Sequence, residues 1–335
     1  MAGVPEHAQA SATGQARVAF VIPVRNDADR LRTCLRGLLA STGGTPHELL
    51  VMDHGSTDDT AAVARTLGAR VVTVHGGNVA ALRNAGAAAT TAPLIAFIDA
   101  DNEVVPGWTA AGLAAMGNGV GLAGDAYRAP SPGTWVQRTY DALRRHATRV
   151  EPTEWLGAGN MLVRREAFVA AGGFDESLET CEDVDLCNRL ALAGWQVLAV
   201  PGMATIHHGD PDTLGRVFWG EMWRGRDNLR VTLRGPRTWR TLVSAAMPVA
   251  YVLALAGLVV APFLGTWLSP LVAFASATGV SMLLVLRLLA MRRNAGGRWP
   301  DGPWAAMMVA LAYDLGRSLA VVARVGHGRR QGARA

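Results

Sequence analysis

Two carboxylates, Asp99 and Asp101, close the apolar run from Leu94 to Ile98 and are separated by a single alanine. Carboxylates at the end of a buried strand are unfavourable unless a positive group meets them, and a divalent metal carrying a diphosphate would do so. The pattern therefore points to chemistry on a nucleotide-activated substrate. Because Asp-x-Asp is short and common, it equally fits the ordinary start of a surface loop.

A second acidic group, Glu182, Asp183 and Asp185, follows Cys181. Carboxylates are favoured by the helix dipole at a helix start, and Asp185 can pair with Arg189 four residues later. A purely structural interpretation of this group is therefore strong. A Glu-Asp pair by itself leaves a functional role open.

The elements that must position these acids can be predicted from the pattern of apolar residues. The predicted strands lie at 18–24, 48–52, 70–74 and 94–98, and the helices at 31–39, 56–67 and 79–89. Asn26 or Asp27 can cap the first helix, and Ser56 to Asp59 resembles a capping box. Repeated strand–helix units with short links predict an α/β domain with a Rossmann-like, mostly parallel sheet.

In such sheets ligands bind outside the carboxyl ends of the strands. Asp53 directly follows the second predicted strand, and Asp99 and Asp101 follow the fourth. The topology therefore delivers three acids to one rim of one sheet. This spatial argument favours a binding site over a chance loop start.

Beyond Asp101 the alternation becomes irregular. We expect strands at 119–128, 155–164 and 195–200, a loop at 175–178 and a helix at 182–193. His207 and His208 follow the last of these strands.

The C-terminal third is predicted to be a helical membrane region. Hydrophobic residues make up 50% of the chain and the mean hydropathy is +0.18, with the excess near the C-terminus. No charged residue or histidine occurs from Thr241 to Leu286, which is long enough for two spans of about 20 residues. We expect a two-span hairpin at about 241–264 and 267–287 and a third apolar helix at about 303–325.

The third helix differs because it contains Asp314 and Arg317, which are three residues apart and are expected to pair. If it crossed the bilayer, the basic tail that follows would lie outside, against the positive-inside rule. We therefore expect an interfacial or packed helix and a cytoplasmic C-terminus. The basic residues of that tail are Arg324, Arg329, Arg330 and Arg334.

The net charge of +5 is carried largely by arginines that flank the hairpin, so a membrane partner is favoured over a nucleic acid. Both flanks are expected on the cytoplasmic side. The flanking residues are Arg224, Arg226, Arg230, Arg234, Arg237 and Arg240 before the hairpin, and Arg287, Arg292, Arg293 and Arg298 after it.

The expected organisation is a disordered tail at 1–16, a catalytic domain at 17–232 and the membrane region at 233–335. The tail lacks the apolar segment of a signal peptide. The three cysteines form no CxxC pair and are expected to be reduced thiols.

Several motifs in a fixed order resemble family 2 glycosyltransferases over roughly Val18 to Arg230. They are the runs Val21–Asp27, Asp53–Asp58, Ala81–Gly86, Asp99–Asn102, Gly159–Met161, Gly172–Glu176 and Glu182–Leu186. The resemblance implies a GT-A fold, an inverting transfer from a nucleotide-diphosphate sugar, and a divalent cation such as Mg²⁺ or Mn²⁺.

The resemblance also assigns roles by position. Asp101 resembles the metal ligand, with Asp99 its partner near the ribose or the metal, and His207, preferred to His208 for its His-x-Gly spacing, completes the site. Asp183 resembles the general base, and Glu182 beside it is the second expected catalytic residue, which would shape the pKa of Asp183 or hold the acceptor. The expected donor-binding residues are Pro23, Val24, Asp27, Asp53, His54, Arg83 and Asp99. The expected acceptor-side residues are Gly159, Asn160, Trp223 and Arg224.

The chain departs from the family pattern at two positions. His54 stands where a second acid commonly helps to read the donor base, so the donor nucleotide is left open. Arg25 stands where an aromatic residue is frequent. Trp223 and Arg224 have an alternative interpretation as an interfacial membrane anchor.

The leading hypothesis is a glycosyltransferase of the bacterial inner membrane, with its catalytic domain facing the cytoplasm. It would use a nucleotide-sugar donor and a membrane-associated or lipid-linked glycan acceptor. Two alternatives remain: a non-catalytic membrane scaffold with a degenerate transferase domain, and a nucleotidyltransferase on a similar sheet.

Overall fold

The computed structural model describes residues 16–236 and 238–323 of the 335-residue chain. The predicted N-terminal tail, except for its last residue, and the basic C-terminal tail lie outside the described residues. In the part that is described, eight strands form one twisted sheet in the order β3-β2-β1-β4-β9-β6-β10-β8. These strands are β1 (Val18–Val24), β2 (His47–Asp53), β3 (Arg70–Thr73), β4 (Leu94–Ile98), β6 (Val120–Gly124), β8 (Glu151–Pro152), β9 (Asn160–Arg164) and β10 (Gln196–Ala199).

The strands β3, β2, β1 and β4 are mutually parallel, as are β6 and β10. β9 lies between β4 and β6 and runs antiparallel to both, and β8 is an antiparallel edge strand. The predicted mostly parallel α/β sheet is therefore confirmed. Pattern alone did not reveal the reversal of β9.

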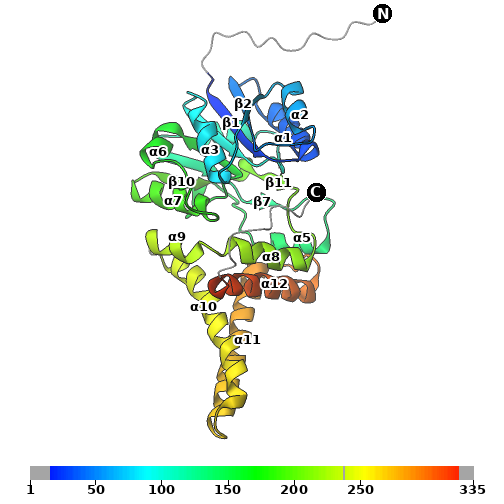
Figure 1. The fold of residues 1–335 in the computed structure, drawn as a ribbon, viewed down its shortest axis with the longest axis vertical. Coiled ribbons are helices and arrows are strands. Elements are labelled where there is room, and N and C mark those ends of the chain that lie inside the picture. The colour runs from blue at the N-terminus through cyan, green and yellow to red at the C-terminus, as the bar shows by residue number, and fades with distance from the viewer. Residues whose placement is uncertain (1–15, 237, 324–335) are drawn as a thin grey trace, which may run out of the picture.

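Helices cover both faces of the sheet (Figure 1), because alternate strand residues point to opposite sides. Phe20 and Ile22 of β1 pack with one apolar cluster, whereas Ala19 and Val21 pack with the other. The first cluster includes residues of α1 (Ala28–Ser41), α2 (Thr60–Thr66) and α4 (Trp108–Ala115). The second includes residues of α3 (Val79–Ala88), α6 (Arg165–Ala170) and α7 (Glu182–Leu192).

One predicted helix start is wrong, and one predicted side-chain cap is not made. The helix expected from Ser56 begins at Thr60, because the Asp58 carboxylate accepts the Thr60 amide and caps the turn there. Asp27 does precede α1, but its side chain makes no cap and instead binds the Arg30 guanidinium at 2.9 Å.

A second sheet lies beside the first and was not predicted. Within the described residues it has three strands in the order β5-β11-β7: β5 (Asn102–Val104), β11 (Thr205–His207) and β7 (Tyr127–Arg128). The single strand expected at 119–128 is broken after Gly124, so Tyr127 leaves the large sheet and pairs with β11. The register of β5 and β11 sets His207 opposite Asn102.

Below the sheets lies a layer of helices formed by α5 (Trp135–Asp141), α8 (Leu214–Arg224) and α9 (Asn228–Arg234), with α12 (Gly302–Val322) packed beneath α8 (Figure 1). The contact between α8 and α12 is close: a Cβ at Gly316 would lie 2.4 Å from the Phe218 carbonyl oxygen. Short 3₁₀ turns occupy Pro201–Met203 and Ala261–Phe263.

Three helices of the described chain are long and apolar enough to cross a membrane. α10 (Trp239–Val260) and α11 (Leu268–Asn294) form a hairpin that projects away from the sheets (Figure 1). Many of its large apolar side chains are exposed, and Phe263 at the tip is 85% exposed. So large an exposed apolar surface is expected to contact lipid.

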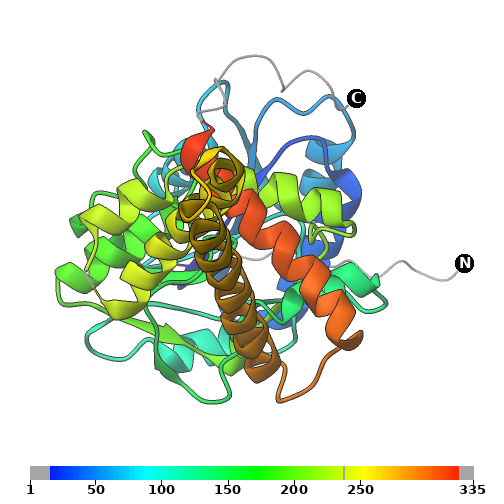
Figure 2. The ribbon, with the colours of Figure 1, turned by 90° about the horizontal axis from the view of Figure 1, so that it is seen from below.

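α12 lies across the base of the hairpin rather than alongside it, as Figure 1 and the view from below in Figure 2 both show. Its outward side chains include Trp304, Met308 and Val322, whereas Ala306, Val309 and Ala310 are buried against the helices above. α12 is therefore more deeply packed than either helix of the hairpin.

The predicted pairing of Asp314 with Arg317 is wrong. Asp314 instead accepts hydrogen bonds from Arg287 of α11, the shorter at 2.6 Å, and Arg317 donates to Glu221 of α8 at 2.8 Å. Both side chains face neighbouring helices, where buried charges need a partner of the opposite sign. These two ion pairs tie α12 to the hairpin on one side and to α8 on the other.

Some of the arginines counted toward membrane orientation also bind the catalytic domain. Arg226 pairs with Glu179 at 3.2 Å, and Arg234 pairs with Asp175 at 3.2 Å. These pairs hold α9 and its preceding turn against the loop before α7.

Candidate functional site

The carboxyl ends of β1, β2 and β4 meet at one rim of the large sheet. Val24 is in register with Asp53, while β4 pairs with β1 only as far as Val21, opposite Phe97. Pro23 therefore lies beyond the β4 ladder, where a missing amide is tolerated on that side. Asp99 directly follows β4. Asp53, Asp99 and Asp101, the three acids expected at this rim, therefore all lie there.

Arg83 of α3 joins the two acidic groups singled out in the sequence. It is 3% exposed, and it donates to Asp99 Oδ1 at 2.6 Å and to Glu182 Oε1 at 2.8 Å. Burial works against its charge, but Asp99 and Glu182 outweigh this and raise the pKa of Arg83 above its usual range. The end of β4 and the start of α7 therefore meet through one buried cation.

Asp183 lies in the first turn of α7, beside Glu182. Burial, reinforced by the charge of Glu182, raises the pKa of Asp183 to about 7. Its surface is only partly open, and its Oδ1 accepts the Val184 amide at 2.8 Å. A carboxyl group with this pKa can take up and release a proton near neutral pH.

Asp101 faces His207, which the β5–β11 register brings across from it. His207 Nε2 lies 3.4 Å from Asp101 Oδ2, whereas His208 pairs with Glu103 at 2.8 Å. Burial lowers the pKa of His207, but hydrogen bonds with Asp101 and Asp210 overcome this and raise it to about 9. The same contact with His207 lowers the pKa of Asp101 despite its burial.

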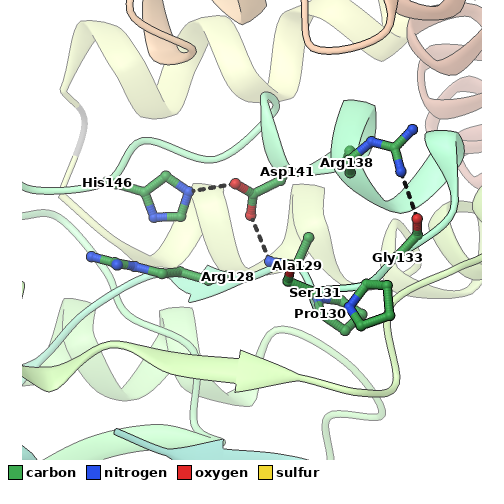
Figure 3. Close-up of a pocket in the computed structure, with 9 residues that line it drawn as sticks. Arg128, Ala129, Pro130, Ser131, Gly133, Arg138, Asp141 and His146 are labelled. Carbon is green, nitrogen blue, oxygen red and sulfur yellow. Dashed lines mark hydrogen bonds and ion pairs between the residues drawn. The ribbon is translucent and has the colours of Figure 1, made fainter.

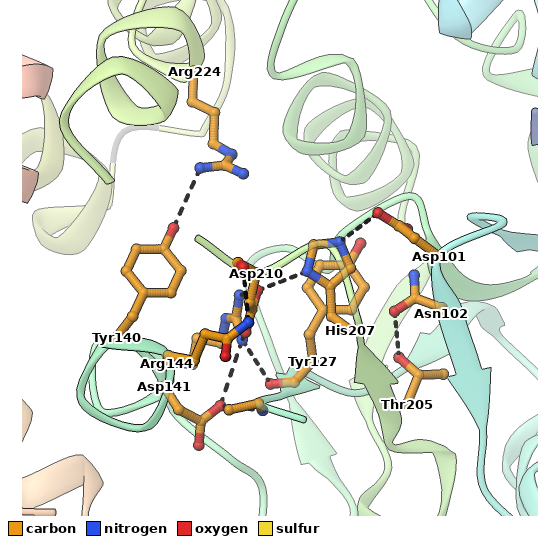
Figure 4. A network of polar contacts seen from close by, with 12 residues as sticks. Asp101, Asn102, Tyr127, Tyr140, Asp141, Arg144, Thr205, His207, Asp210 and Arg224 are labelled. Carbon is orange, nitrogen blue, oxygen red and sulfur yellow. Dashed lines mark hydrogen bonds and ion pairs between the residues drawn. The ribbon is translucent and has the colours of Figure 1, made fainter. Parts of the chain in front are cut away.

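His207 is held from behind by a polar network (Figure 4). Its Nδ1 lies 2.6 Å from Asp210 Oδ1, and its ring stacks on Tyr127 with centroids 5.0 Å apart. Arg144 binds both oxygens of Asp210. Contacts with His207 and Arg144 outweigh burial and lower the pKa of Asp210 to about 2.

Asp101 and His207 form a donor set that suits a divalent cation. Carboxylate oxygen and imidazole nitrogen are both Mn²⁺ ligands, and Mg²⁺ is commonly held by one or two carboxylates plus substrate phosphates. A Cβ at Gly209 would lie 2.1 Å from Asp101 Oδ2, so only glycine leaves this side of the carboxylate open. Across residues 16–236 and 238–323, no group of three potential ligands gathers around one point. The remaining ligands would come from substrate oxygens and water.

Oδ1 of Asp99, the other expected metal ligand, accepts a hydrogen bond from Arg83. Arg30 comes within 3.9 Å of Asp101 and also binds the expected donor residue Asp27. Asp53 is buried and accepts the Ser56 amide, and the His54 amide donates to the Val24 carbonyl oxygen. These contacts shape the rim at the ends of β1 and β2.

The four expected acceptor-side residues do not share one surface. Gly159 packs on Asp99, since a Cβ there would lie 2.2 Å from Asp99 Oδ2. Asn160 is completely buried and binds Trp108 and two backbone carbonyls, so we no longer place it toward an acceptor. Trp223 is half exposed on α8, and Arg224 pairs with Glu221 at 2.9 Å.

Sequence reasoning missed Tyr127, Arg144 and Asp210. The hydroxyl of Tyr127 accepts the Gly159 amide at 3.0 Å. Burial, together with the charges of Asp99 and Asp183, raises the pKa of Tyr127 well above its usual value, so its ring lies near both acids. The spacing of Asp210 three residues after His207 was the one available signal.

A surface cavity of about 590 Å³ lies between the loop after β7 and α5, and neither Asp101 nor Asp183 lines it (Figure 3). Its charged groups are largely satisfied within the protein. His146 binds Asp141 at 3.0 Å, and Arg138 binds Asp301 next to α12. We assign no role in the chemistry to this cavity.

Known proteins match this chain over the sheet and its rim. The family model described as glycosyl transferase family 2 matches residues 19–169, a range that includes Arg83, Asp99 and Asp101 but not Asp183 or His207. The chain is 31% identical over 190 residues to an uncharacterized glycosyltransferase of Mycobacterium bovis, covering 54% of this chain and 82% of that protein. It is 27% identical over 243 residues to glycosyltransferase AglE of Haloferax volcanii, covering 69% of this chain and 79% of the relative.

A shorter match, 48% identical over 65 residues, is to an N-acetylglucosaminyl-diphospho-decaprenol L-rhamnosyltransferase of Mycobacterium tuberculosis. It covers 18% of this chain and 21% of that protein. Among solved structures, a mannosyltransferase from Pyrobaculum calidifontis in complex with GDP-Man and Mn²⁺ superimposes with a TM-score of 0.56 at 16% identity. The superposition covers 92% of this chain and 88% of that one, and it shows that the two share the GT-A fold.

Replacement of Arg83 by Met is expected to destabilise the protein in a pH-dependent way. It leaves Asp99 and Glu182 without their shared cation, at a cost of about 3 kcal/mol at pH 7.5. Uncompensated carboxylates have a higher pKa in the folded state than in the unfolded state, so protonation favours folding. The thermal unfolding temperature of R83M should therefore recover toward that of the wild type as the pH falls from 7.5 to 5.

Arg32, whose pair with Asp29 is exposed, provides the control. R32M should unfold close to the wild type at every pH, because exposed pairs contribute little. An R83M protein that unfolds like R32M across this range would show that the bridge does not hold the two acids together.

Proposed function

Because the chain belongs to glycosyltransferase family 2, we propose that it is a metal-dependent, inverting enzyme that transfers a sugar from a nucleoside-diphosphate donor. The proposed acceptor is a hydroxyl of a membrane-associated or lipid-linked glycan. The observation that carries the proposal is one rim at which Arg83 joins Asp99 of the donor side to Glu182, the neighbour of Asp183. Family membership does not favour the alternatives of a degenerate scaffold or a nucleotidyltransferase.

On the donor side, Asp101 and His207 would hold the divalent cation, with diphosphate oxygens completing its coordination. When bound, the cation supplies positive charge to a departing diphosphate. Arg83 keeps Asp99 fixed beside this site. The rim residues Asp53 and His54, at the end of β2, are proposed to contact the nucleoside.

On the acceptor side, Asp183 would act as the general base. Its carboxylate takes the proton of the acceptor hydroxyl while that oxygen forms a bond to the anomeric carbon. The bond from the anomeric carbon to the diphosphate oxygen breaks at the same time, and its electron pair leaves with the nucleoside diphosphate. One displacement of this kind inverts the anomeric configuration.

The class of acceptor is proposed from the position of the catalytic domain. α8 lies between the small sheet and α12, so the rim is held close to the apolar helices (Figure 1). The short match to a decaprenol-linked sugar transferase supports a lipid-linked acceptor. The nucleotide and the sugar stay open, because His54 replaces the acid that would suggest a base.

We place the protein in the bacterial inner membrane with the catalytic domain in the cytoplasm. The hairpin of α10 and α11 would cross the bilayer twice, and α12 would lie in the interface because it runs across the hairpin axis (Figure 2). Trp304 and Met308 would then face the boundary between headgroups and acyl chains. The buried face of α12, which carries Ala306, Val309 and Asp314, stays against the protein.

Two substitutions should separate the donor and acceptor roles. In a screen of nucleotide sugars with Mg²⁺ or Mn²⁺, followed by release of nucleoside diphosphate, D101A should lose turnover and metal-dependent donor binding. D183N should lose turnover by about 10²- to 10⁴-fold while keeping donor binding, because only the base is removed. Turnover close to the wild type in either variant would contradict the assigned role.

The pH dependence of turnover should report Asp183. Since the base acts only when deprotonated and its pKa is about 7, kcat/KM should fall as the pH drops below about 7. Protonation of His207 would also oppose metal binding below its pKa of about 9, so the profile should be measured at two Mn²⁺ concentrations. If Asp183 causes the fall in kcat/KM at acidic pH, the midpoint of that fall should not change when the Mn²⁺ concentration is raised. A midpoint that shifts entirely with the Mn²⁺ concentration would exclude Asp183 as its cause.

Cysteine labelling in intact cells tests the topology. An impermeant external thiol reagent should modify G265C, at the turn of the hairpin, but not V322C, at the end of α12. V322C should react only after the cells are opened. External labelling of V322C would show that α12 crosses the membrane.

A further inference from the structure

We propose that Asp210 and Arg144 are positioning residues that hold the imidazole of His207 toward Asp101. The inference rests on the proposed function, in which His207 binds the cation, and it does not depend on the identity of the sugar. Neither residue reaches the rim itself; each acts through His207.

The imidazole of His207 has contacts on three sides, and only one of its ring nitrogens faces the proposed cation site. Asp210 Oδ1 lies 2.6 Å from Nδ1, Tyr127 covers one ring face, and Nε2 points to Asp101 (Figure 4). An ionised carboxylate can only accept a hydrogen bond, so Nδ1 must carry the proton. When the imidazole is neutral, the Nε2 lone pair is directed at the cation site, and the ring cannot turn without losing its bond to Asp210.

The side chain of Asp210 is itself completely buried. A buried carboxylate needs compensation, which Arg144 supplies by binding both of its oxygens, Oδ2 at 2.7 Å. The Asp210 backbone is fixed as well: its carbonyl accepts the Gln137 side chain, and its amide donates to the His207 carbonyl oxygen. Asp210 therefore has little freedom to follow a ring that moves.

Arg144 is in turn anchored in the helical layer above α12. Its guanidinium lies 5.1 Å from the Tyr140 ring and 5.7 Å from the Tyr127 ring. The Tyr140 hydroxyl donates to Glu221 at 2.6 Å, and Glu221 also accepts from Arg317 of α12. The orientation of His207 is therefore set by the α5–α8–α12 layer as well as by its own loop.

The test uses the full-length protein in detergent with Mn²⁺, alone and with GDP or UDP. Free Mn²⁺ measured by electron paramagnetic resonance gives the affinity, and pulsed measurements of coupling to ¹⁴N report whether an imidazole is bound to Mn²⁺. The variants are H207A, D210A, D210N, R144M and R144K. R138M is the matched control, because Arg138 lies on α5 near Arg144 but pairs with Asp301 instead.

The wild type and R138M should show ¹⁴N coupling, and H207A should lose it. D210A should lose most of the coupling and bind Mn²⁺ about 10- to 100-fold more weakly. R144M should likewise lose ¹⁴N coupling and bind Mn²⁺ more weakly. D210N keeps an acceptor for Nδ1, so it should retain more ¹⁴N coupling than D210A. R144K keeps a cation beside Asp210, so it should retain more coupling than R144M.

Two results would overturn the inference, and they are distinguishable. If H207A loses the coupling while D210A and R144M keep it at wild-type affinity, Asp210 and Arg144 do not position the ring. If H207A itself binds Mn²⁺ like the wild type, the metal role of His207 in the proposed function is wrong and the inference falls with it. Should D210A fail to fold, the comparison of R144M with R144K and R138M decides the question.

Discussion

The bridge from Arg83 to Asp99 and Glu182 is the interaction on which the rest of the site depends. These two carboxylates come from segments more than eighty residues apart, and the buried cation lets them approach without repelling one another. A guanidinium suits this task because its planar fork can bind two acids at once and keeps its charge when buried. Through this contact the start of α7, and with it Asp183, is fixed relative to the end of β4.

The two sheets position different parts of the site. The large sheet brings the ends of β1, β2 and β4 to one rim, while the small sheet carries His207 across to Asp101 and sets Tyr127 behind it. The small sheet also leads directly into α8, which packs on α12. The catalytic domain and the apolar helices are therefore one continuous structure, in which the ion pairs of Arg317 and Asp314 join neighbouring helices.

Features that depend on local pattern were predictable from the sequence. The four parallel strands before Asp101 follow from β-branched runs of the right length, and the lack of charge from Thr241 to Leu286 indicates membrane helices. The preference for His207 over His208 agrees with the placement of His207 beside Asp101. Arg83, expected at the donor, also contacts Glu182, a contact that no spacing along the chain indicates.

Features decided by tertiary contacts were not predictable. The reversal of β9 and the departure of Tyr127 to the small sheet depend on which strands lie side by side. Asp314 and Arg317 are correctly spaced to pair, yet each binds a different helix because both are enclosed between neighbours. The resemblance places Asn160 on the acceptor side, but its side-chain amide is hydrogen-bonded inside the fold to Trp108 and to backbone carbonyls.

The central claim is a single displacement in which Asp183 deprotonates the acceptor on one side of the sugar while the diphosphate leaves from the other. The most direct measurement is the anomeric configuration of the newly formed glycosidic bond, read by proton NMR from the coupling of the anomeric hydrogen in the first product formed. The account predicts the configuration opposite to that of the donor sugar. A product that keeps the donor configuration would contradict it.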